Sequence, residues 1–257
     1  MIRPTASPAS VHKRAYDARP ESDVLTLGDA PLDARLMSGL ARAALHEIYA
    51  ACPEDSSAAA AFALMLALRG GESGAPIFWV REDRAEKLCG RLCAAGLIEL
   101  GADPAQFCLV QADNARGVLR AGADIARCAA LGGAKGAVVI EVYGTVSLLD
   151  LTASRRLALA AAQSGVLTLV LRVSAEPQPS AAHTRWQVSA APSSALAANA
   201  PGQPVLQIKL LRHRGGISGF ETRIEWNRDE RRCIETPLSG AASAAALLRT
   251  DLARQAA

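Results

Sequence analysis

Residues 45–57 read LHEIYAACPEDSS, and the apolar stretch Ala58–Leu68 follows directly. Leu45–Tyr49 is predicted to be a short buried strand and Ala58–Leu68 a helix, so the order is strand, loop, helix. This is the order of a nucleotide-binding P-loop, whose sequence is G-x-x-x-x-G-K-[ST]. The stretch therefore predicts a fold of the nucleotide-binding type.

The loop lacks the residues that hold phosphates. Ala50 and Asp55 stand at the two glycine positions, and Ser56 and Ser57 stand at the Lys and Ser/Thr positions. Glycines let backbone N–H groups turn toward phosphates, and the lysine adds a positive charge, whereas Asp55 would repel a triphosphate. Asp55 or Ser56 is well suited to cap the following helix. We expect a capped turn and no bound cofactor, with a modified nucleotide site as the alternative.

Composition indicates one globular domain with terminal extensions. The chain has 257 residues, of which 50% are hydrophobic but only 4% aromatic, so Ala, Leu, Val and Ile must form most of the core. The net charge of +3 neither requires nor excludes nucleic acid. Residues 1–21 contain no apolar signal segment, and no apolar run approaches the length of a membrane span. A cytoplasmic protein without membrane contact is expected.

Six cysteines occur, none of them in a CxxC pair. Cys89 and Cys93 are one helical turn apart, but no histidine accompanies them at the spacing of a zinc site. We therefore expect no metal, and free, buried cysteines of the kind usual in a reducing compartment.

Strands and helices alternate from residue 34 to residue 173. The predicted strands are 45–49, 76–81, 106–111, 137–142 and 166–173, and the predicted helices are 34–41, 57–68, 87–95, 114–131 and 150–164. Residues 137–142 form a continuous apolar run, typical of a strand buried on both faces of a parallel sheet. The alternation predicts an α/β fold with helices on both faces of the sheet.

The pattern changes after residue 173. Residues 186–188, 205–212 and 220–226 are shorter, alternating segments separated by Gly and Pro, which predict antiparallel strands at an edge of the sheet. Ala241–Arg254 is predicted to be a helix with a leucine stripe that packs on its own domain or docks in a partner groove. The expected organisation is a flexible arm at 1–23, an α/β domain at 24–235 and a helical tail at 236–257.

Over residues 24–226 this order of elements resembles the RecA-like ATPase core. Four segments are further similar to the ImuA family, the SulA/RecA-like damage-inducible mutagenesis proteins of bacteria: LHEIY at 45–49, IFWVRED at 77–83, SAAHTRW at 180–186 and IKLLRHRGG at 208–216. Their order and spacing carry the resemblance more than any single motif. It implies a RecA-like three-layer core, with a mostly parallel sheet, antiparallel C-terminal edge strands and helices on both faces.

The resemblance also implies partners. ImuA-type proteins are associated with ImuB, a catalytically inactive relative of Y-family polymerases, and with an error-prone replicative-type polymerase in translesion synthesis. The expected function is a non-catalytic adaptor of this DNA-damage response, with RecA as a further partner through imitation of its protomer interface. The alternatives are a RecA-like ATP-binding regulator of recombination or repair, and a cell-division inhibitor of the SulA type, which the length and the alternation disfavour.

Two acids stand where a RecA-like ATPase needs them. Glu82, or its neighbour Asp83, follows the second strand, where an acid activates water, and Glu141 ends the strand that carries a magnesium-associated acid. No glutamine sensor follows Leu171. Phosphoryl transfer depends on positioning and charge neutralisation, so we expect no hydrolysis from these acids alone. Their alternative roles are a helix N-terminal acid for Glu82 and a paired strand-end carboxylate for Glu141.

Basic residues gather beside a glycine turn and in the arm. The first group is predicted to be a hairpin tip that presents charge to DNA or to an acidic partner, with solvated surface charge as the alternative; it comprises Lys209, Arg212, His213 and Arg214. In the dipeptide Arg185-Trp186, the ring either packs under the sheet or anchors a protein interface while the arginine points outward. Aromatic residues for stacking bases are scarce, so DNA binding should be weak and salt-sensitive.

Overall fold

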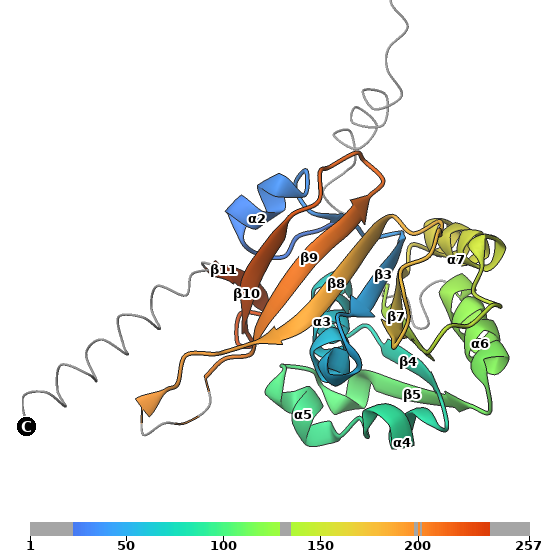
Figure 1. Ribbon diagram of the computed structural model, residues 1–257, viewed down its shortest axis with the longest axis horizontal. Helices are drawn as coiled ribbons and strands as arrows, with labels where there is room; N and C mark the ends of the chain where they lie inside the picture. The colour runs from blue at the N-terminus through green and yellow to red at the C-terminus, as the bar shows by residue number, and fades with distance from the viewer. Residues whose placement is uncertain (1–22, 129–134, 198–199, 201, 237–257) are drawn as a thin grey trace, which may run out of the picture.

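In the part of the chain that the computed structural model describes, residues 23–128, 135–197, 200 and 202–236, nine strands form one large sheet (Figure 1). From edge to edge they are β11 (Arg232–Thr236), β10 (Glu221–Asn227), β9 (Val205–His213), β8 (Thr184–Ala191), β3 (Leu45–Ala50), β7 (Leu167–Val173), β6 (Ala137–Tyr143), β4 (Ile77–Glu82) and β5 (Phe107–Ala112). The strands from β8 to β5 are parallel, and β9, β10 and β11 are antiparallel. The short strands β1 (Val24–Leu25) and β2 (Leu40–Ala41) pair separately.

Helices cover both faces of the sheet. On one face α3 (Ser56–Gly70) packs against β3, β6, β7 and β8, and on the other α6 (Ala115–Arg127) and α7 (Leu151–Ser164) pack against the sheet and each other. Since side chains alternate along a strand, Ile48 and Leu171 face α3, whereas Val138 and Val170 face α6 and α7. The predicted α/β class is therefore confirmed, with the layers of a RecA-like core.

The remaining helices are short. They are α2 (Ala30–Arg35), α4 (Ala85–Cys89), α5 (Ala94–Glu99) and the 3₁₀ turns η2 (Pro53–Asp55) and η3 (Pro104–Gln106). The predicted helix 87–95 is wrong, because Gly90, with φ of 84°, breaks it into α4 and α5 in a conformation that favours glycine. The predicted helix 34–41 is misplaced, because Asp29 accepts a bond from the Leu32 N–H and starts α2 earlier.

Local capping signals mark the starts of α6 and α7, the two long helices on the face opposite α3. The Asn114 side chain accepts the Gly117 N–H at 3.0 Å, and Asp150 accepts the Ala153 N–H at 2.7 Å. Gly165, with φ of 77°, ends α7. These starts agree with the prediction. The predicted end of the first helix at Leu131 is too late, because α6 ends at Arg127 and Cys128 is its C-cap; residues 129–131 lie outside the described part of the chain.

The C-terminal strands differ in detail from the expectation. The segment predicted as an antiparallel edge at 186–188 is β8, which pairs in parallel with β3 and antiparallel with β9, so it is not an edge strand. The edge is β11, which was not predicted. The arm, with Arg3, Lys13, Arg14 and Arg19, and the helix expected at 241–254 lie outside the described residues. In the described part, no helix combines the length and apolarity needed to span a bilayer.

The expectation of buried cysteines is largely wrong. Only Cys233 is buried; Cys89 is half-buried, and four thiols are exposed, at Cys52, Cys93, Cys108 and Cys128. All six are free. Burial raises the pKa of the Cys233 thiol to about 12 and that of the Cys89 thiol to about 11, so both are protonated at neutral pH.

Candidate functional site

The loop after β3 forms a compact turn in place of a phosphate cradle. Its 3₁₀ turn η2 runs directly into α3, so Asp55 holds the N-cap position. The Asp55 side chain does not cap the helix, which corrects the prediction. Its Oδ1 accepts the backbone N–H of Ala190 at 2.8 Å, and its Oδ2 accepts a bond from the Cys52 thiol at 3.0 Å. Asp55 therefore ties the turn to β8.

Two backbone donors of this turn are already used. The N–H of Ala51 donates to Val188 O at 2.8 Å, and the N–H of Asp55 donates to Cys52 O at 3.1 Å. A phosphate cradle needs such groups to point at the ligand together with a positive charge. The turn instead places the Asp55 carboxylate at the start of α3, where a nucleotide would meet repulsion.

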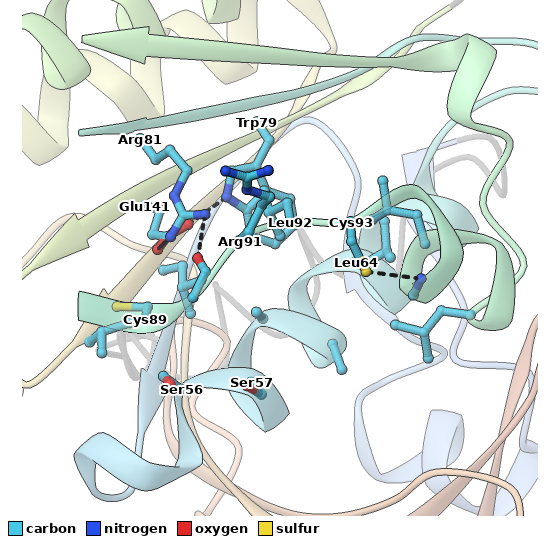
Figure 2. A pocket seen from close by; sticks show the side chains of 18 residues that line it. Ser56, Ser57, Leu64, Trp79, Arg81, Cys89, Arg91, Leu92, Cys93 and Glu141 are labelled. Carbon is cyan, nitrogen blue, oxygen red and sulfur yellow. Dashed lines mark hydrogen bonds and ion pairs between the residues drawn. The ribbon is translucent and has the colours of Figure 1, made fainter. Parts of the chain in front are cut away.

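A largely apolar cavity of about 180 Å³ lies between α3 and the α4–α5 segment, over β4, β6 and β7 (Figure 2). Ser56 and Ser57 line it from the first turn of α3, and Glu141 lines it from the sheet. Ala50 and Asp55 are not among the residues that line it. The structure thus places the two serines and one of the predicted acids around one space, but separates them from the rest of the loop.

Glu141 is held by an ion pair that the sequence analysis did not identify. Arg81 Nη2 donates to Glu141 Oε1 at 2.9 Å, and Trp79 Nε1 donates to Oε2 at 2.6 Å (Figure 2). The Arg81 and Glu141 side chains are only 4% and 5% exposed. Burial raises the pKa of Glu141, while Arg81 and then Trp79 oppose the shift. Both oxygens of the predicted magnesium-associated acid are therefore engaged by protein donors.

The second predicted acid lies on the other face of the sheet. Glu82 ends β4 and is buried, and its Oε2 accepts a bond from Arg84 Nε at 2.6 Å. It neighbours Arg81 along the strand, so the two side chains point to opposite faces. Glu82 and Glu141 therefore do not converge on one reacting group.

Next to the position of the missing sensor is a buried arginine. Arg172, near the end of β7, is 2% exposed, and its guanidinium lies 5.6 Å from the centre of the Tyr49 ring. Its Nε and Nη2 have no hydrogen-bond partner among the described residues. Burial raises the pKa of Tyr49, so the hydroxyl stays protonated beside it. Tyr49 and Arg172 therefore form a buried polar pair on this face of β3 and β7.

The predicted basic tip is dispersed in the structure. Lys209 lies opposite Glu221 within the β9–β10 ladder, with its Nζ 3.7 Å from a Glu221 carboxylate oxygen. Arg212 donates to Ser180 O at 2.9 Å, and His213 is buried with its ring centre 5.0 Å from that of His183. Of the predicted group, Arg212 and Arg214 stay exposed without an ion pair in the described part of the chain, and Arg212 is bonded to backbone oxygens.

Trp186 and Arg185 are both structural. The Trp186 side chain is fully buried against Phe62 and Phe220, and its Nε1 donates to Thr184 Oγ1 at 2.8 Å. The alternative of an exposed interface anchor at Trp186 is therefore wrong. Arg185 does not point freely outward either, because its Nε donates to the buried Glu47 at 2.9 Å.

The sequence analysis missed the arginines of α6 and α7. Arg116 and Arg120 are one turn apart on α6, and Arg155 and Arg156 are adjacent on α7. All four are exposed. The signal was available, because residues four apart on a predicted helix share a face.

Comparison of the chain with protein-family models and with characterised proteins gives no match. Within the described ranges, no group of three or more His, Cys, Asp or Glu side chains is placed to hold a metal ion. What the site can do therefore has to be inferred from its own geometry. Two N–H groups of the turn are engaged, Glu141 is paired with Arg81, and Asp55 ties the turn to β8.

Proposed function

We propose that this protein is a non-catalytic adaptor of an error-prone translesion synthesis complex, acting in the bacterial cytoplasm. The observation that carries the non-catalytic part is the turn closed by Asp55, which holds a carboxylate and engaged N–H groups where phosphates would need free donors and a lysine. The engagement of both Glu141 oxygens supports it, because a magnesium-associated acid needs a free oxygen.

The partners in this proposal rest on the resemblance of four segments to the ImuA family. They are a catalytically inactive Y-family polymerase relative of the ImuB type, an error-prone replicative-type polymerase, and RecA. The layered core supports the proposal, since a RecA-like core without nucleotide chemistry still offers surfaces for assembly. Direct contact with DNA is a minor part of it, because Lys209 is paired with Glu221 and His213 is buried, which leaves only Arg212 and Arg214 of the described basic group exposed without an ion pair.

Nucleotide assays test the first half of the proposal. The purified chain is expected to show no binding of MgATP and no hydrolysis above background at about 1 mM, the upper end of ordinary KM values. Isothermal calorimetry and phosphate release measure the two quantities. The Glu82→Ala variant is the control for contaminating ATPase, because a contaminant would be unaffected by it. Turnover that disappears in Glu82→Ala would contradict the proposal.

Reconstitution tests the second half. The tagged full chain is expected to retain the inactive polymerase relative through washing, with or without MgATP, because no nucleotide state controls the core. Co-purification followed by size-exclusion chromatography measures this. An interaction that requires MgATP would favour the alternative of an ATP-binding regulator, and no interaction would refute the proposed partner.

A further inference from the structure

The helices α6 and α7 lie side by side on the face of the sheet opposite α3 (Figure 1). A groove lies between them. It encloses about 320 Å³ and is lined by two kinds of side chain. The apolar ones are Leu119, Ala123, Leu148, Ala153 and Leu157. The charged ones are all arginines: Arg116, Arg120, Arg127 and Arg156.

The positive charge of the arginines is not compensated by acidic residues of the groove. No acidic residue lines it, and Arg127 alone has an ion pair, with Asp124 at 2.5 Å. In the described part of the chain, Arg116, Arg120 and Arg156 have neither an ion pair nor a side-chain hydrogen bond. Three unpaired guanidinium groups around one hollow favour an anionic occupant.

The apolar lining excludes an occupant that is only anionic. Leu148 is 43% exposed, and no aromatic side chain lines the groove. A nucleic-acid strand would pair its phosphates with the arginines, but it would leave Leu148 facing water and would find no ring on which to stack its bases. An occupant with one apolar face and acidic flanks satisfies both kinds of lining residue.

The dimensions fit a helix. Arg116 and Arg127 stand at opposite ends of the α6 side, which at 1.5 Å per residue places their backbones about 16 Å apart, or three turns. Residues 116, 119, 120, 123 and 127 form one stripe along α6. A helix laid beside such a stripe places its apolar residues at i, i+3, i+4 and i+7 on the leucines.

We propose that the α6–α7 groove docks an acidic amphipathic helix of a partner protein. The inference rests on the proposed function only in taking that helix to belong to a member of the assembly. The site is separate from the altered loop, which lies on the α3 side of the sheet.

The test uses fluorescence anisotropy with the full chain and three labelled peptides of about four turns, the length that covers the α6 stripe. The first carries leucines at i, i+3, i+4 and i+7 with flanking glutamates, the second replaces the glutamates with lysines, and the third replaces the leucines with alanines. We expect the first to bind at least about tenfold more tightly than either of the others.

Two double variants locate the binding. Arg120→Glu with Arg156→Glu is expected to weaken binding of the first peptide at least about tenfold, a difference readily resolved in a titration. The control, Arg91→Glu with Arg228→Glu, makes the same change in net charge at exposed residues outside the groove and is expected to leave binding within about twofold. Thermal unfolding of both variants checks that they fold.

Defined results would overturn the proposal. One is equal binding of the three peptides; another is unchanged binding in the groove variant. A third is binding of a 20-nucleotide single strand that the groove variant abolishes, without binding of the acidic peptide, which would assign the surface to nucleic acid. Reconstitution keeps the two proposals apart: peptide binding without retention of the polymerase relative refutes the proposed function alone, and retention without peptide binding refutes the groove.

Discussion

Replacing Arg81 with methionine is expected to lower the free energy of unfolding by about 3–5 kcal/mol at pH 8. The change leaves the buried Glu141 carboxylate without its cation, with only the Trp79 N–H as a described donor. The cost arises from the uncompensated charge more than from the lost bond, because water cannot solvate the carboxylate there. Urea denaturation followed by fluorescence measures it.

The pH dependence gives this prediction a second readout. Burial raises the pKa of Glu141 and Arg81 lowers it, so removing Arg81 raises it further. When a carboxyl has a higher pKa folded than unfolded, the folded state binds more protons between the two values, and stability falls as pH rises through that window. The Arg81→Met variant should therefore lose less stability at pH 5 than at pH 8.

Two controls separate charge burial from other effects. Arg91 lines the same cavity but is 76% exposed and pairs with the exposed Glu86, so Arg91→Met should cost less than about 1 kcal/mol. Adding Glu141→Gln to Arg81→Met removes the charge and keeps an acceptor for Trp79, so it should recover most of the loss and flatten the pH dependence. A loss below about 1 kcal/mol in Arg81→Met itself would contradict the buried pair.

Replacing Trp186 with alanine is expected to cost about 3–5 kcal/mol, the usual range for truncating a fully buried aromatic side chain. The ring lies at the joint between the parallel and antiparallel parts of the sheet, with its centre 5.7 Å from that of Phe62 and 6.1 Å from that of Phe220. The change opens a void that β8 and α3 cannot fill. The midpoint of urea denaturation measures the loss.

The conservative variant Trp186→Phe keeps most of the volume and loses the bond to Thr184, so its cost should be about 1–2 kcal/mol. The pair of variants distinguishes a core residue from an interface anchor. A Trp186→Ala protein that unfolds like the wild type but fails to retain its partner would overturn the assignment to the core.

The layers of the fold could be predicted from the sequence because they follow from local signals. The apolar run at 137–142 predicted a strand buried on both faces, and Asn114 and Asp150 marked the starts of α6 and α7. The direction of β8 could not be predicted in this way. It pairs with β3, about 140 residues away, and no local pattern states which distant strand becomes a neighbour.

The same limit explains what was missed at the site. Arg81 and Glu141 lie on one face of adjacent strands, but only the order of strands in the sheet makes them neighbours. Asp55 was predicted as a helix cap from its position, whereas the N–H of Ala190 on β8 competes for its carboxylate and binds it. Burial of His213 and Trp186 likewise depends on tertiary packing, which charge and aromatic character do not reveal.

The hydrogen bond from the Ala190 N–H to Asp55 also bears on whether this turn could be converted into a phosphate-binding loop. Glycine at position 55 is one requirement of a phosphate cradle, yet it would take away the acceptor that joins the turn to β8. The single change Asp55→Gly would therefore weaken the attachment of the turn to β8 before any phosphate contact existed to compensate. Asp55 thus has a structural role at a position where the P-loop motif has glycine.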